Sequence, residues 1–118
     1  MVLVDTSVWV GHLRKGDTGL ETLLNDGEVV CHPFIIGEIA CGTIKNRTTI
    51  LSLLQALPVI IQADNRKVMD FIESDNLMGK GLGYIDIHLL ASAVLTSVLV
   101  WTHDKALNEV ASEMRLAF

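Results

Sequence analysis

The first seven residues read M-V-L-V-D-T-S (residues 1–7), and they decide what kind of fold to expect. Val2–Val4 is a continuous apolar run, which is typical of a strand buried on both faces of a parallel sheet. Asp5 follows at once and precedes Thr6 and Ser7. Asp, Thr and Ser all accept hydrogen bonds from free N–H groups at a helix start. Asp5 therefore has two explanations: it caps the next helix, or it lies at the opening of a functional site.

Further apolar runs resemble the first one, and helical patterns separate them. The expected strands are Val2–Val4, Val29–Cys31, Val59–Ile61 and Val98–Trp101, with an additional edge strand at Leu116–Phe118. The expected helices are Thr6–Leu13, Thr18–Leu24, Pro33–Lys45, Thr48–Leu57, Asn65–Met78, Ile85–Ser97 and Lys105–Met114. Alternation of strand and helix predicts right-handed crossovers and a parallel sheet with helices on both faces. We therefore expect an α/β fold, a three-layer α/β/α sandwich with a mainly parallel central sheet, in one domain over residues 1–118.

Length and composition exclude several classes of protein. The chain has 118 residues, half of them apolar, and a formal net charge of −5, so the strongly basic balance typical of nucleic-acid-binding proteins is absent. Cys31 and Cys41 lack zinc-site spacing, and we expect two reduced core thiols of a cytoplasmic protein. Residues 87–102 are uncharged but fall short of the roughly 20 residues of a membrane span, and the N-terminus lacks a signal-peptide pattern. The sequence therefore predicts no membrane association.

Four carboxylates lie outside ordinary polar surroundings. Glu38 stands alone in an otherwise uncharged stretch, and Asp86 lies at the start of the most apolar helix. Taken singly, each has a simple explanation. Glu38 is exposed on a polar stripe, Asp86 lies at the positive end of a helix dipole, and Asp5 and Asp104 are helix caps.

Taken together, the same four carboxylates predict a shared site. Asp5 and Asp104 follow strands, and open α/β sheets bind ligands beyond the carboxyl ends of their strands. Two like charges 4 Å apart repel by about 4 kcal/mol at an effective dielectric constant near 20, so four need protons or a cation. Carboxylate oxygens without sulfur or imidazole partners suit Mg²⁺, for which Mn²⁺ substitutes. The histidines show no ligand spacing and are expected to be structural or at the surface: His12, His32, His88 and His103.

Four stretches of the chain resemble, in the same order, the PIN-domain ribonucleases, and among them the VapC-type toxins of prokaryotic toxin–antitoxin pairs. They are M-V-L-V-D-T-S-V-W-V-G-H-L-R, H-P-F-I-I-G-E-I-A-C-G, G-L-G-Y-I-D-I-H-L-L-A-S-A and L-V-W-T-H-D-K-A-L, at residues 1–14, 32–42, 81–93 and 99–107. The resemblance implies a PIN-like fold, a homodimer, and RNA cleavage that depends on Mg²⁺ or Mn²⁺. It also implies a cognate VapB-type antitoxin that occupies the active-site groove.

The resemblance assigns roles to individual side chains. The catalytic and metal-binding acidic quartet of the family matches four positions, which we call the acidic quartet: Asp5, Glu38, Asp86 and Asp104. Thr6 corresponds to the hydroxyl that follows the first aspartate, and Thr102 to the hydroxyl that supports the last. His103 stands where many relatives carry a basic residue such as arginine, which changes only the local charge beside the substrate.

Two further expectations concern the substrate and rival functions. An alternative is a phosphatase with Asp5 as covalent nucleophile, but Ser7 stands where haloacid-dehalogenase-type phosphatases carry a second acid. A second alternative is an inactive PIN-like binding module, and the complete acidic quartet argues against it. Five cations are candidates for contacts with the RNA backbone, ordinary surface charge being the alternative for each: Arg14, Lys15, Lys45, Arg47 and Lys80.

Overall fold

The sheet is built around β1 (Val2–Val4). In the computed structural model, which describes residues 1–118, β1 lies between β2 (Val29–Val30) and β3 (Leu99–Trp101), and both pairings are parallel. Every residue of β1 is buried, since helices cover both faces of the sheet. The first apolar run of the sequence is thus the central strand.

The two outer strands predicted from the sequence are reduced to single parallel bridges. Val59 pairs with Cys31, and Ala117 pairs with Val100. Pro58, which precedes Val59, has no N–H and takes part only through its carbonyl, which accepts from the N–H of Cys31 at 2.9 Å. The sheet is parallel throughout, but its outer segments each add one pair instead of a continuous strand.

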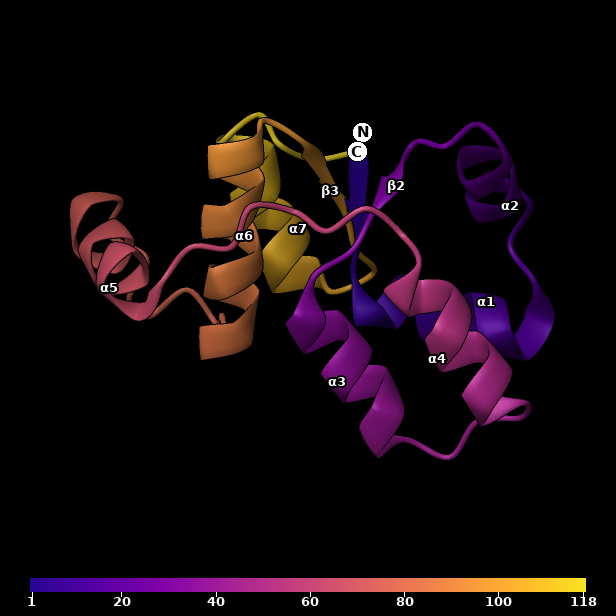
Figure 1. The fold of residues 1–118 in the computed structure, drawn as a ribbon. Coiled ribbons are helices and arrows are strands. Elements are labelled where there is room, and N and C mark those ends of the chain that lie inside the picture. Colours follow the sequence, from indigo (N-terminus) through magenta and orange to yellow (C-terminus); the bar gives the residue numbers. More distant parts are fainter.

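Helices form the two outer layers. They are α1 (Thr6–Lys15), α2 (Thr18–Asn25), α3 (Pro33–Cys41), α4 (Arg47–Gln55), α5 (Asn65–Ser74), α6 (Tyr84–Thr96) and α7 (Lys105–Glu113). In Figure 1, α5 to α7 lie on one side of the strands and α1 to α4 on the other, so the predicted α/β/α sandwich is confirmed. None of these helices combines the length and the apolar character that crossing a bilayer requires.

Two helices end four residues earlier than the sequence pattern predicts. Helix α3 ends at Cys41 because Gly42 adopts an extended backbone, with φ of −88° and ψ of 168°. Helix α5 ends at Ser74, and shortly afterwards Asn76 takes a left-handed backbone with φ of 53°. Both stops come from single residues, glycine and asparagine, that tolerate non-helical conformations.

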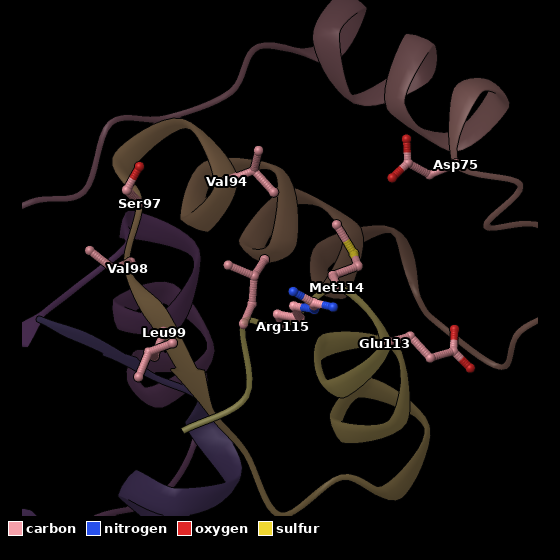
Figure 2. Close-up of a pocket in the computed structure, with 9 residues that line it drawn as sticks. Asp75, Val94, Ser97, Val98, Leu99, Glu113, Met114 and Arg115 are labelled. Atoms are coloured by element: carbon pink, nitrogen blue, oxygen red, sulfur yellow. The ribbon is translucent and has the colours of Figure 1, made fainter.

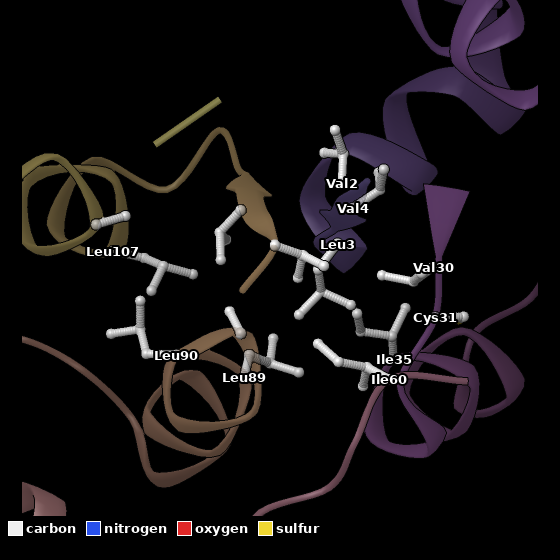
Figure 3. Close-up of a cluster of buried hydrophobic side chains, with 14 of the residues drawn as sticks. Val2, Leu3, Val4, Val30, Cys31, Ile35, Ile60, Leu89, Leu90 and Leu107 are labelled. Carbon is white, nitrogen blue, oxygen red and sulfur yellow. The ribbon is translucent and has the colours of Figure 1, made fainter. Parts of the chain in front are cut away.

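The hydrophobic core fills the space between sheet and helices. It contains 26 buried residues that form one cluster, so all three layers share a single core. Figure 3 shows Leu3 of the central strand close to Leu89 of α6 and Ile35 of α3, and all three are fully buried. This packing fixes the starts of α3 and α6 against the sheet, which matters for the site described below.

The two cysteines occupy different environments, and both are free. Cys31 is buried, and burial raises the pKa of its thiol to about 11, so the thiol is protonated at neutral pH. Cys41 is exposed, so the expectation of a second core thiol was wrong. The reason is its position on α3: Ile35 and Ile39 form the buried face of this helix, and Cys41 lies off that face.

Candidate active site

The carboxylate of Asp5 decides between the two explanations for this residue. Asp5 occupies the N-cap position of α1, yet its side chain accepts no capping hydrogen bond from a backbone N–H of this helix. Its Oδ2 atom instead accepts from the hydroxyls of Ser7 and Thr102, each at 2.8 Å. The residue is only 7% exposed, and its second oxygen has no hydrogen-bond partner in the protein. Asp5 is therefore held as an oriented carboxylate at the end of β1, and capping does not explain its side chain.

Two hydroxyl groups connect the ends of β1 and β3. Thr102 Oγ1 accepts from the N–H of Asp104 at 3.0 Å, and Ser7 Oγ accepts from the N–H of His103 at 3.0 Å. Each hydroxyl uses its proton for Asp5 and its lone pairs for the loop after β3. Thr102 was expected from the sequence, whereas Ser7 was missed. Its position in D-T-S, directly after the first strand, was the available signal.

Asp86 and Asp104 reach the same region from the starts of α6 and α7. Asp86 Oδ2 accepts from the N–H of Gly83 at 3.0 Å, and Asp104 Oδ2 accepts from the N–H of Leu107 at 2.9 Å. The pKa of Asp86 is raised mainly by burial; the hydrogen bond from Gly83 opposes this, and the charges of Asp5 and Asp104 raise it further. Because these charges act on Asp86, the three aspartates form one electrostatic cluster.

Glu38 borders this cluster from α3. It is exposed, and its Oε1 atom accepts from the hydroxyl of Thr6 at 2.8 Å. Since Thr6 directly follows Asp5, Glu38 lies against the first turn of α1. The hydroxyl of Thr6 thus contacts Glu38, and Ser7 is the residue of this turn that contacts Asp5.

The acidic quartet shares one pattern of hydrogen bonding. In each carboxylate one oxygen is held by a protein donor, and the other has no hydrogen-bond partner in the protein. As the side chains lie, no three of them surround a common point at metal-binding distance. These four carboxylates nevertheless fit a hard divalent cation. Each has one oxygen held by a hydrogen bond from the protein and one free oxygen that could bind the ion, and the negative charges repel one another unless a cation is present.

A groove of about 680 Å³ lies between α1, α3 and the segment that leads into α4, and Glu38 is the member of the acidic quartet that lines it. Arg14 and Lys45 line this groove together with Glu38. Two of the five expected RNA-binding cations thus share a groove with Glu38. Lys15 is exposed at the end of α1, next to Arg14.

The other two cations already have partners within the protein. The Arg47 guanidinium donates to the carbonyl of Ala40 at 2.8 Å, close to the C-terminal end of α3. The Lys80 ammonium lies 3.8 Å from a carboxylate oxygen of Glu113, and both side chains are well exposed. These contacts make Arg47 and Lys80 weaker candidates for RNA contacts than the sequence indicated.

A second hollow, of about 620 Å³, lies at the opposite end of β3. Figure 2 shows Arg115 in its middle, with Ser97 and Leu99 on one side and Glu113 on the other. No member of the acidic quartet lines it. It is separate from the site at the carboxyl ends of the strands.

Comparison with known proteins agrees with this geometry. The PIN domain family model matches residues 2–113. The chain belongs to the PIN-domain family. It is also 42% identical over 118 residues to Ribonuclease VapC32 of Mycobacterium tuberculosis, in strain CDC 1551 / Oshkosh and in strain ATCC 25618 / H37Rv, with coverage of 99% of this chain and 95% of each relative. The predicted membership of the PIN-domain proteins, and of the VapC type among them, is confirmed.

Proposed function

We propose that this PIN-domain protein is a metal-dependent endoribonuclease and the toxin component of a toxin–antitoxin pair. The observation that carries the proposal is the cluster of Asp5, Asp86 and Asp104, whose repulsion a divalent cation would neutralise. The similarity to Ribonuclease VapC32 over nearly the whole chain supports RNA as the substrate. The phosphatase alternative has no second acid at position 7, where the hydroxyl of Ser7 is engaged with Asp5.

The free oxygens of Asp5, Asp86 and Asp104 would hold the cation, with Glu38 completing the shell. Mg²⁺ is the expected ion, and Mn²⁺ would substitute for it. When bound, the cation supplies activation of water at neutral pH and neutralisation of charge on the phosphate. Ser7 and Thr102 fix the direction of the Asp5 carboxylate, and the N–H groups of Gly83 and Leu107 do the same for Asp86 and Asp104.

The reaction is hydrolysis of an RNA phosphodiester by in-line attack of water. A water oxygen bonds to phosphorus as the bond to the 3′-oxygen breaks, and the leaving 3′-oxygen takes up a proton. The products carry a 3′-hydroxyl and a 5′-phosphate, since the ribose 2′-hydroxyl takes no part as nucleophile. Asp104 and Glu38 are exposed at the rim and have a free oxygen, so either one is placed to orient the water and accept its proton.

Arg14 and Lys45 would bind the RNA backbone in the groove beside Glu38. Local cations are needed because the chain has a net charge of −5, and contacts of this kind weaken with added salt. We assign the same groove to a VapB-type antitoxin, which would block RNA by covering Arg14 and Lys45. We also expect a homodimeric toxin.

Removal of divalent ions is expected to stop RNA cleavage, and Mg²⁺ or Mn²⁺ should restore it. The reason is that the carboxylates alone provide neither an activated water nor a positive charge for the phosphate. The measurement is cleavage of an end-labelled single-stranded RNA before and after treatment with EDTA, with mapping of the product ends. Cleavage that persists in EDTA, or products that carry a 2′,3′-cyclic phosphate, would contradict the proposal.

Replacement of Thr102 by valine is expected to lower kcat by about 10–100-fold, as for other groups that orient a metal ligand. Valine keeps the shape of threonine, but Asp5 loses a donor and the N–H of Asp104 loses its acceptor. Leaving such groups unpaired should also destabilise the fold by about 1–3 kcal/mol in urea unfolding. The matched control is Thr48→Val on the exposed face of α4. If stability falls while kcat stays at the wild-type value, Thr102 has only a structural role.

A further inference from the structure

Two aromatic side chains remain exposed beside the acidic quartet. Phe34 is 39% exposed and Tyr84 is 46% exposed. Phe34 precedes Glu38 by four residues on α3, so the two side chains share one side of this helix, one turn apart. Tyr84 is the first residue of α6 and stands two residues before Asp86. Both rings therefore lie at the edge of the sheet where the acidic quartet gathers.

The two rings are fixed in place by buried imidazoles. The His88 ring lies 5.0 Å from Phe34 and 4.6 Å from Tyr84 between ring centroids, with edge-to-face angles of 71° and 90°. His32 packs against Phe34 at 4.8 Å, and its Nδ1 atom accepts from the N–H of Phe34 at 2.9 Å. The hydroxyl of Tyr84 donates to Asn65 Oδ1 at 2.9 Å. The aromatic pair is thus exposed to solvent and yet already ordered.

The layer behind the aromatic pair is buried. His32 and His88 are 1% and 3% exposed, and the Nε2 atom of each is buried without a hydrogen-bond partner. Burial and, secondarily, the neighbouring His88 lower the pKa of His32 to about 4, so His32 is neutral at pH 7. The side chains of Phe34 and Tyr84 have no charge to offer to a phosphate, but their exposed rings present aromatic surface to a flat partner. This chemistry favours a nucleobase.

We propose that Phe34 and Tyr84 form a stacking platform for bases of single-stranded RNA next to the bond that is cut. The proposal rests on the proposed function and deepens it. Glu38 lies between the platform and the groove lined by Arg14 and Lys45. Bases would stack on the aromatic pair on one side of Glu38, and phosphates would contact the cations on the other. Because every base has an aromatic face, such a platform adds affinity without reading sequence.

The test compares RNA binding by leucine variants in the Asp5→Asn background, which keeps the RNA intact. The probe is a short single-stranded RNA that contains 2-aminopurine, whose fluorescence falls when the base stacks. Phe34→Leu and Tyr84→Leu are each expected to weaken binding by about tenfold and to remove the fluorescence change. Tyr84→Phe, which keeps the ring but loses the bond to Asn65, should rescue both signals. Phe71→Leu, on α5, is the matched control for the loss of a ring.

The outcomes separate this proposal from the proposed function. If the wild type cuts RNA with Mn²⁺ but both leucine variants, folded by circular dichroism, bind and respond like their parent, only the platform is wrong. If the wild type neither binds nor cuts RNA, both proposals fail. If the leucine variants lose affinity only because a dimer dissociates in sedimentation, the aromatic pair joins two copies of the chain and the platform is wrong.

Discussion

Replacement of Asp5 by asparagine is expected to reduce RNA cleavage by on the order of 10³-fold or more, because a group that holds the ion contributes several kcal/mol to the transition state. Asparagine has nearly the same shape, and its amide oxygen still accepts from the hydroxyls of Ser7 and Thr102. What changes is the charge of a buried residue at the centre of the acidic quartet. The fold should therefore survive while the site loses its affinity for a cation.

The measurement for Asp5→Asn is the initial rate of cleavage of labelled RNA at saturating Mn²⁺, together with the urea midpoint of unfolding. Asp70→Asn is the matched control, since Asp70 is exposed on α5 and makes no side-chain hydrogen bond to the quartet. The Asp70→Asn variant should cut RNA at the wild-type rate. Wild-type activity in purified Asp5→Asn protein would remove Asp5 from the mechanism, whatever its position in the structure.

The central part of the fold could be predicted because local patterns and topology agree there. The run Val2–Val4 is apolar without alternation, and a strand of this kind needs cover on both faces. Alternation with helices then places the carboxyl ends of parallel strands at one edge. For this reason Asp5 and Asp104 could be assigned to one edge from the sequence, and Asp86 could be added because its helix packs against the same sheet.

Other parts of the site depend on side-chain directions that periodicity does not determine. Thr6 and Ser7 are adjacent in the first turn of α1, and either hydroxyl was able to serve Asp5. The turn directs Ser7 to Asp5 and Thr6 to Glu38. Likewise, the sequence around Arg47 and Lys80 is typical of unpaired surface cations. Only tertiary packing brings Arg47 to the carbonyl of Ala40 and Lys80 to Glu113.

Hydrogen-bonded caps show how a single residue can have two roles. The simple explanation for Asp104 was correct, since its Oδ2 atom accepts from the N–H of Leu107 at the start of α7. Asp86 likewise reaches back to Gly83. In both residues the second oxygen remains free, so capping orients the carboxylate and leaves one ligand atom available. Sequence alone presents capping and metal binding as alternatives, whereas this geometry allows both.

Replacement of Asp86 by asparagine is expected to abolish cleavage and, without metal, to raise the melting temperature by a few degrees, on the order of 2–5 °C. The pKa of Asp86 is raised in the folded protein by burial and by the charges of Asp5 and Asp104, although the bond from Gly83 opposes this. A folded-state pKa above the unfolded value means that the ionised carboxylate weakens the fold. This penalty is absent below the unfolded value of 3.8 and grows as the pH rises through the folded pKa.

Calorimetric melting of the wild type and of Asp86→Asn, with and without Mn²⁺, tests this account. Without metal at neutral pH the variant should melt above the wild type, and the gap should close as the pH falls toward about 4 and Asp86 takes up a proton. With Mn²⁺ the wild type should gain more than the variant, because the ion replaces the repulsion by attraction. A variant that is less stable without metal, or that gains as much from Mn²⁺ as the wild type, would show that Asp86 is a helix cap whose charge does not serve a cation. The difference between the two melting curves thus measures by how much the burial of the Asp86 charge and its repulsion by Asp5 and Asp104 lower the stability of the fold.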